Sequence, residues 1–241
     1  MRCQKCGVAW TSPRPGEVDY ASGDFHSAFA LKDEVAIDSA KLPWEWRHSL
    51  DVQLKMLQAV LAPGAHVHEV GCGQGMFLEM LCKAGYRVTG IEPSKSASQV
   101  ALAKGIEVET GYFGSENTIQ QADCVVFSQV LEHIGDPHRA LAGAAALVPD
   151  GYLLFFQTNF RGLMPRVTRR KWAWFPLEHF WHFTPASLTR WVARHGFVPV
   201  DVRYVSLVQG NWKSKLIQFA SFCLPHAQDG FIALYRQVPC R

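Results

Sequence analysis

The stretch His68-Glu69-Val70-Gly71-Cys72-Gly73-Gln74-Gly75 decides the fold that we expect for this 241-residue chain. The apolar run before it, Ala65 to Val70, predicts a strand, and the run after it, Met76 to Ala84, predicts a helix. Because glycine has no Cβ atom, such a loop turns sharply and lets a ligand approach the backbone closely. The alternative is a tight strand-to-helix turn that binds nothing.

Two carboxylates and one missing glycine indicate which kind of ligand the loop binds. Glu92 ends the next expected strand, where a carboxylate accepts hydrogen bonds from ribose hydroxyls. Glu69 stands two residues before the first glycine, where it can meet an ammonium group. Met76 occupies the place of the third glycine of a dinucleotide fingerprint. The loop therefore favours a nucleoside that carries an ammonium group over a nicotinamide dinucleotide.

Strand and helix patterns alternate beyond this loop, which predicts an α/β fold with a mostly parallel sheet and helices on both faces. The expected helices are residues 43–61, 76–84, 94–104, 137–147, 185–195 and 212–223, and the expected strands are residues 65–70, 86–91, 106–109, 123–128, 152–158, 198–207 and 230–236. Residues 161–183, rich in Arg, Trp and Phe, interrupt the alternation, and we expect this insertion to cover the acceptor pocket. We expect a head of residues 1–42 and one domain of residues 43–241.

Composition excludes several classes of protein. The formal net charge is only +3, so we expect no nucleic-acid partner. No apolar run is long enough for a transmembrane helix, and the N-terminus lacks the apolar stretch of a secretory signal. Seven scattered cysteines favour a reducing cytoplasm over a disulfide framework.

Four motifs together resemble those of class I S-adenosylmethionine-dependent methyltransferases. They are Glu69 to Gly75, Gly90 to Pro93, Asp123 to Ile134 and Pro149 to Gly151. The resemblance covers about residues 45–241. It implies a Rossmann-like, seven-stranded sheet with an antiparallel last strand, and S-adenosylmethionine as the methyl donor.

The same resemblance assigns the donor-binding positions. They are Glu69, Gly71, Cys72, Gly73, Gly75, Glu92, Pro93, Tyr112, Phe113, Ser128, Gln129 and Val130. Glu92 would hold the ribose, and Tyr112 or Phe113 would flank the adenine. Ser128 and Gln129 would touch the methionine portion.

Glu132 and His133 belong to a run that resembles ubiquinone-type O-methyltransferases. In some of those relatives this pair, with an acid three residues earlier, is thought to hold a divalent metal. Here that earlier residue is Gln129, and a neutral amide weakens a site for a hard cation. We therefore expect no metal, and expect Glu132 and His133 to cap the next helix and shape the donor pocket.

The segment Glu178 to Thr184 resembles bacterial sugar C-methyltransferases, in which a Glu-His pair serves proton abstraction. Histidine suits proton transfer near neutral pH, so His179 is the leading candidate base. Glu178 is its expected partner, and His182 is the second candidate base. The alternative is that these histidines only pack within an aromatic cluster.

Basic residues precede this segment between Arg166 and Lys171. They could bind the phosphates of a nucleotide sugar, form a solvated face, or contact a membrane surface, since tryptophans lie among them.

Cys3 and Cys6, followed by Gly7, resemble one knuckle of the zinc ribbon that precedes many such methyltransferases. A structural zinc site needs four ligands, and the chain has no second Cys-x-x-Cys. We expect no stably bound zinc in a single chain.

The leading expectation is methylation of a small molecule, a sugar, nucleotide sugar or glycan precursor in bacterial biosynthesis. The alternative is O-methylation of a phenolic or quinone-like molecule. A donor-binding protein without catalysis and a dinucleotide-dependent oxidoreductase remain as other classes.

Overall fold

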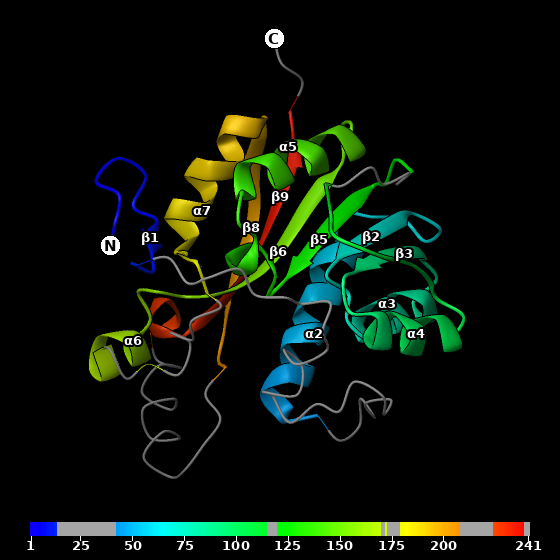
Figure 1. Cartoon of the computed structure of the whole chain (residues 1–241), viewed down its shortest axis with the longest axis horizontal. Helices are drawn as coiled ribbons and strands as arrows, with labels where there is room; N and C mark the ends of the chain where they lie inside the picture. Colours follow the sequence, from blue (N-terminus) through cyan, green and yellow to red (C-terminus); the bar gives the residue numbers. More distant parts are fainter. Residues whose placement is uncertain (14–41, 115–119, 170–171, 173–178, 208–223, 239–241) are drawn as a thin grey trace.

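A seven-stranded sheet organises the part of the chain that the structure describes (Figure 1). The structure is a computed structural model that describes residues 1–13, 42–114, 120–169, 172, 179–207 and 224–238. The strands of the sheet are β2 (His66–Val70), β3 (Arg87–Glu92), β4 (Glu107–Thr110), β5 (Cys124–Ser128), β6 (Tyr152–Thr158), β8 (Phe197–Val205) and β9 (Gly230–Gln237). Their order is β4-β3-β2-β5-β6-β9-β8.

Strand direction confirms the predicted Rossmann-like topology. Strands β2 to β6 pair in parallel, whereas β9 pairs antiparallel with both β6 and β8. The last strand is thus antiparallel, as the resemblance implied.

Five of the described α-helices lie close to predicted ones, and one within residues 161–183 was not predicted. They are α2 (Trp44–Gln58), α3 (Met76–Lys83), α4 (Lys95–Ala103), α5 (Pro137–Leu147), α6 (Leu163–Thr168) and α7 (Pro185–Val192), with the short 3-10 helices η3 (Leu131–His133), η5 (Ala193–His195) and η6 (Pro225–Ala227). In α2 the buried face contains Gln53 and Met56, whereas Leu54, predicted on that face, is only half-buried. The helix expected at residues 212–223 lies outside the described residues.

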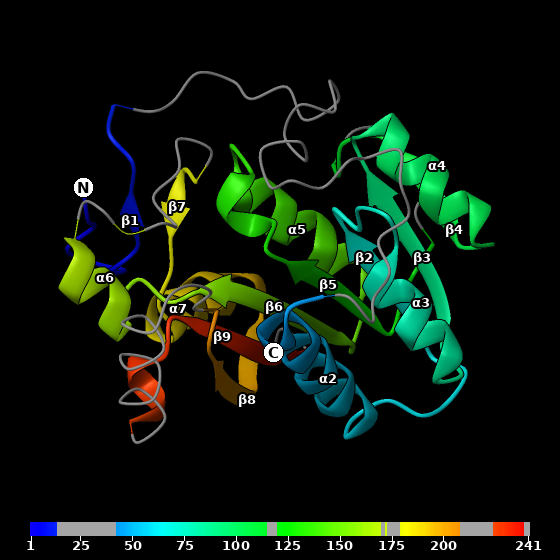
Figure 2. The same cartoon turned by 90° about the horizontal axis from the view of Figure 1, so that it is seen from below.

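Alternation along the strands produces two hydrophobic cores. In β5, Val125 and Phe127 belong to the core shared with α5 and α7, whereas Cys124 and Val126 belong to the core shared with α2, α3 and α4. Figure 2 shows α5 and α2 on opposite sides of the sheet. Because both faces are covered, the carboxyl ends of the parallel strands are where a ligand can reach the backbone.

The predicted insertion contains structure that its composition did not reveal. Helix α6 follows β6, and the two-residue strand β7 (Trp181–His182) pairs antiparallel with β1 (Ala9–Trp10) of the head. Pairs this short leave no alternation pattern in a sequence. Among the described helices, none has the length and apolar character needed to cross a bilayer.

Candidate functional site

The glycine loop connects β2 to α3 and is built on left-handed backbone. Gly71, Gly73 and Gly75 have φ of 66°, 53° and 70°. A Cβ on Gly71 would lie 2.6 Å from Val130 Cγ2, and one on Gly75 would lie 2.9 Å from Ile106 Cδ1. No atom of the described residues lies within 4 Å of a Cβ built on Gly73. Packing therefore requires glycine at positions 71 and 75, whereas Gly73 borders open space that a ligand can enter.

Two buried carboxylates lie beside this loop. Glu92 accepts hydrogen bonds at 2.8 Å from the backbone N–H of Gly73 through Oε2 and of Ser94 through Oε1. Glu69 Oε2 is buried and has no hydrogen-bond partner among the described residues. Burial, and then the nearby charge of Glu92, raise the pKa of Glu69 well above its ordinary value. A ligand that brings positive charge and hydroxyl donors would stabilise this pair.

These features fit S-adenosylmethionine. Its ammonium group matches the Glu69 oxygen that has no partner among the described residues, and its ribose hydroxyls are donors suited to the Glu92 carboxylate, whose oxygens accept hydrogen bonds. The open space at Gly73 would admit the nucleoside against the backbone.

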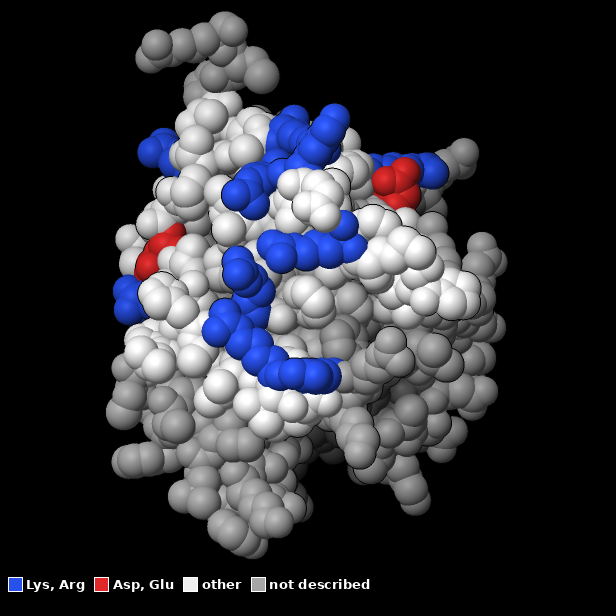
Figure 3. Space-filling view, turned by 90° about the vertical axis from the view of Figure 1, so that its left-hand side faces the viewer, with Lys and Arg blue, Asp and Glu red and all other residues white. Residues whose placement is uncertain are grey.

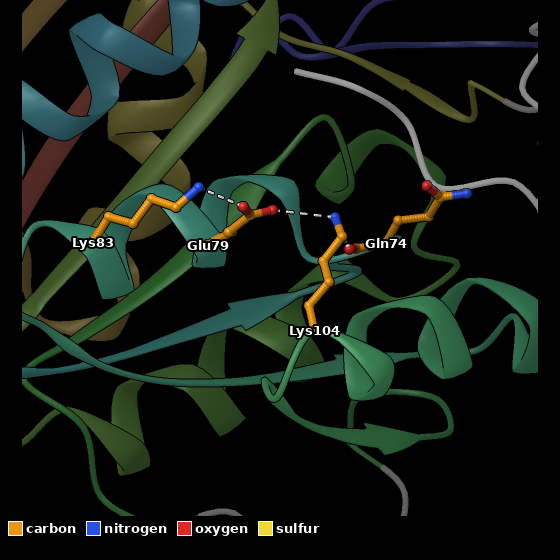
Figure 4. Close-up of polar contacts among 4 residues, drawn as sticks. All are labelled: Gln74, Glu79, Lys83 and Lys104. Carbon is orange, nitrogen blue, oxygen red and sulfur yellow. Dashed lines mark hydrogen bonds and ion pairs between the residues drawn. The ribbon is translucent and has the colours of Figure 1, made fainter. Parts of the chain in front are cut away.

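A lysine that the sequence did not single out holds the loop from outside (Figure 4). Lys104, at the end of α4, donates a hydrogen bond to the carbonyl oxygen of Gln74 at 3.1 Å and pairs with Glu79 of α3 at 3.3 Å. Lys83 pairs with the same Glu79 from the other side. The loop is thereby fastened to both α3 and α4.

The end of β5 is strained where it approaches the loop. Gln129 has φ of 57°, uncommon for a residue with a side chain, and its Nε2 is buried without a hydrogen-bond partner among the described residues. Val130 packs on Gly71, while Ser128 and Gln129 are half-buried. Strain and an unpaired amide at one residue are typical of a site that a ligand completes.

The two aromatic candidates for the adenine differ in burial. Phe113 packs edge-on against Phe127 with ring centroids 5.9 Å apart, and it lies 6.4 Å from His68. Tyr112 is 49% exposed. Phe113 thus packs against the core and Tyr112 lies at the surface, and which of the two flanks the adenine stays a prediction. Cys72, three residues after Glu69, is buried, and Pro93, next to Glu92, is half-buried.

The histidine His179 lies beside Glu132 and His133 of η3. One ligand atom from each of the three lies within 4.8 Å of the others, and the rings of His133 and His179 meet edge-on at 4.6 Å. The backbone N–H of Phe180 donates to the Glu132 carbonyl at 2.9 Å, which brings the two segments together. The sequence did not indicate that Glu132 lies close to His179. Glu178, the partner that we expected for His179, lies outside the described residues.

Burial alters the chemistry of Glu132. The side chain is fully buried, and one oxygen accepts a hydrogen bond from Gln157 Nε2 at 2.8 Å. Burial raises its pKa from 4.5 to about 7. The expectation that Glu132 and His133 cap the next helix is wrong, because Asp136 is the N-cap of α5 and accepts from Arg139 N. Two imidazoles and one carboxylate form a set able to bind a metal ion, and the absence of a metal stays a prediction.

A basic face lies over the head, α6 and α7. Figure 3 shows Lys and Arg side chains gathered on this side of the molecule. The described residues of these three elements include no acid, and their basic side chains are Arg2, Lys5, Arg166 and Arg190. Arg190 Nη1 donates to the Cys6 carbonyl at 3.1 Å, so α7 and the head are joined there. Arg170 and Lys171 of the predicted cluster lie outside the described residues.

Comparison with known proteins decides the family. A family described as "Methyltransferase domain" matches residues 44–202. The chain belongs to this methyltransferase family. With its fold and its glycine loop, this makes it an S-adenosylmethionine-dependent methyltransferase.

The methyltransferase is similar to both O- and C-methyltransferases. It is 36% identical over 230 residues to a ubiquinone biosynthesis O-methyltransferase of Bordetella avium, an alignment that covers 81% of this chain and 88% of the relative. It is 30% identical over 184 residues to the C-methyltransferase NovU of Streptomyces niveus, covering 73% of this chain and 43% of that protein. The crystal structure of a magnesium protoporphyrin IX methyltransferase from Synechocystis shares the fold, with a TM-score of 0.66, 16% identity and coverage of 90% and 98%.

Proposed function

We propose that this methyltransferase methylates a hydroxyl oxygen of a phenolic or quinone-like small molecule. The observation that carries the proposal is the likeness to the Bordetella avium O-methyltransferase, which extends over 88% of that relative. The sugar acceptor that we ranked first is less well supported, because the alignment with NovU covers only 43% of that protein.

The donor half of the proposed site is the glycine loop and the strand ends around it. Gly71, Gly73 and Gly75 would line the methionine and ribose portions, with Glu69 on the ammonium group and Glu92 on the ribose. The remaining proposed contacts come from Cys72, Pro93, Tyr112, Ser128, Gln129 and Val130. Two observations on the described residues support this assignment: Oε2 of Glu69 is buried without a partner among them, and none of their atoms lies close to a Cβ built on Gly73.

The acceptor half would be the cluster of Glu132, His133 and His179. When bound, S-adenosylmethionine supplies a methyl group on a positively charged sulfur, and the neutral thioether leaves when an acceptor oxygen takes the methyl group. His179 would remove the hydroxyl proton, so that the oxygen lone pair forms the new O–C bond. The nearby carboxyl of Glu132 would balance the charge that His179 then carries, and that proton returns to water after the reaction.

A carbon acceptor is the second candidate. It is supported by the Glu178-His179 pair of the sequence and by the likeness to NovU. A base beside an enolisable carbon would use the same His179, so the histidine alone does not distinguish the two reactions.

Labelled S-adenosylmethionine tests the proposal against two pooled panels, small phenols and catechols in one and nucleotide sugars in the other. We expect label in the phenol panel, carried by a methoxy group in the product's NMR spectrum. His195→Ala is the matched control, because His195 pairs with His138 at 3.2 Å on α5 and should leave transfer unchanged. Label only in the sugar panel would reject the phenolic acceptor, and no label in either panel would reject both acceptors.

A further inference from the structure

Thr11 joins the N-terminal head to the segment that carries the two candidate bases. Its backbone N–H donates to the Phe180 carbonyl at 3.1 Å. Its hydroxyl oxygen lies 2.7 Å from the carbonyl oxygen of His179 and 3.1 Å from Nε2 of His182. One hydroxyl thus contacts both histidines.

The single proton of this hydroxyl determines how the contacts are made. A carbonyl oxygen can only accept, so the Thr11 hydroxyl donates its proton to His179. Were the proton turned toward His182, two oxygen atoms would face each other at 2.7 Å with no proton between them. With its proton used, the hydroxyl can only accept from the ring of His182, which must therefore be protonated on Nε2.

We infer that Thr11 is a positioning residue that fixes His182 as the Nε2–H tautomer and holds the backbone of His179. The role of Thr11 in holding His179 rests on the proposed function, because this contact matters for catalysis only if His179 acts on the acceptor. The head would then help to position the histidines of the acceptor half of the site.

Burial supports a single neutral tautomer. His182 is 3% exposed, and burial lowers its pKa to about 4, so the ring carries one proton near neutral pH. The ring is stacked on Phe160, with centroids 5.6 Å apart and planes 28° apart, which limits its rotation. Only the fixed Nε2–H then faces Thr11, and Nδ1 bears the lone pair.

The segment is held on its other side as well. The Phe180 N–H donates to the Glu132 carbonyl at 2.9 Å, and Trp181 Nε1 donates to the Ile134 carbonyl at 2.9 Å. His179 therefore lies between η3 and the head, and loss of either support would let it move. If His182 accepts a proton or a hydrogen bond during the reaction, it does so at Nδ1.

Nitrogen-15 NMR of histidine-labelled protein tests the tautomer without any acceptor. The wild type is compared with Thr11→Val, which keeps the shape and removes the hydroxyl, and with Thr11→Ser, which keeps the hydroxyl. Thr168→Val is the matched control, since the Thr168 hydroxyl donates to the Met164 carbonyl within α6. The spectrum of His182→Gln assigns the ring signals.

We expect His182 protonated on Nε2 in the wild type, in Thr11→Ser and in Thr168→Val, and a mixture of tautomers in Thr11→Val. A wild-type ring protonated on Nδ1, or an unchanged tautomer in Thr11→Val, would overturn the inference. The wild-type spectrum alone decides the tautomer if Thr11→Val does not fold.

Kinetics with the acceptor found above test the positioning of His179. Thr11→Val should lower kcat at least tenfold with donor affinity unchanged, and Thr11→Ser should restore it. If Thr11→Val has the kcat of the wild type, and if the pH profiles of its kcat and kcat/KM also match the wild type, the positioning role is rejected. Failure of the wild type on both panels rejects the proposed function and leaves the NMR result to decide the tautomer.

Discussion

Glu92 Oε2 accepts a hydrogen bond from the backbone N–H of Gly73 at 2.8 Å. The end of β3 and the glycine loop are thereby fixed to each other by a contact of the chain itself. Because this contact orders the loop without a ligand, it would lower the ordering cost of binding a nucleoside there. This relationship makes Gly73 the most informative glycine to change.

Gly73→Ala should weaken binding of S-adenosylhomocysteine at least tenfold, because the new methyl group enters the open space beside the backbone. Gly64→Ala is the matched control, since Gly64 also has positive φ (85°) and open space but lies before β2. Both variants should lose about 1–2 kcal/mol of unfolding free energy from left-handed strain. Calorimetric titration measures the affinity, and equal affinities in the two variants would contradict the assignment.

Lys104→Met should lower donor affinity several-fold while changing the unfolding free energy by less than about 1 kcal/mol. The variant removes the hydrogen bond to the Gln74 carbonyl, whereas partly exposed ion pairs contribute little to stability. Lys83→Met removes the other partner of Glu79 without touching the loop. If both variants bind S-adenosylhomocysteine alike, Lys104 does not hold the loop.

Glu69→Gln should raise the stability of the ligand-free protein and weaken donor binding. The substitution removes a carboxyl group whose charged form is destabilised by burial and by nearby Glu92, and it also removes the partner proposed for the ammonium group. Urea unfolding with and without S-adenosylhomocysteine measures both effects. A variant that binds like the wild type would exclude Glu69 from the donor site.

Glu132→Gln should flatten the dependence of stability on pH. Because burial raises the pKa of Glu132 from 4.5 to about 7, the folded chain keeps a proton that the unfolded chain releases, and stability falls as pH rises across this interval. At about 1.4 kcal/mol per pKa unit, the wild type should lose on the order of 3 kcal/mol that the variant does not lose. Urea unfolding at about pH 4.5 and about pH 7.5 tests this, and parallel profiles would show that Glu132 is not buried as described.

Local patterns made the core of the fold predictable. The glycine loop, the acid at position 92 and the period of the strands all express interactions between residues close in sequence, so β2 to β6 were expected nearly where they lie. The pairing of Ala9 with His182 depends on residues far apart in the chain, and strands of two residues leave no period. No local feature of Thr11 indicates that it reaches His182.

In the candidate site, too, the residues of local motifs could be predicted, and the contacts between distant segments could not. Glu69 and Gly73 follow from a local motif, whereas the approach of His179 to Glu132 arises only when the insertion folds back over η3. The capping role given to Glu132 and His133 is wrong because Asp136, immediately before Pro137, is the N-cap of α5, which begins at the predicted residue. The role of Lys104 depends on the packing of α4 beside α3, which residue spacing does not specify.

His179→Ala tests the central claim most directly, when donor affinity and methyl transfer are measured on the same protein preparation. The account predicts affinity for S-adenosylhomocysteine within about twofold of wild type, and turnover lower by about 10²–10⁴, the usual contribution of a general base. His195→Ala should behave as wild type in both measurements. Wild-type turnover in His179→Ala would contradict the account.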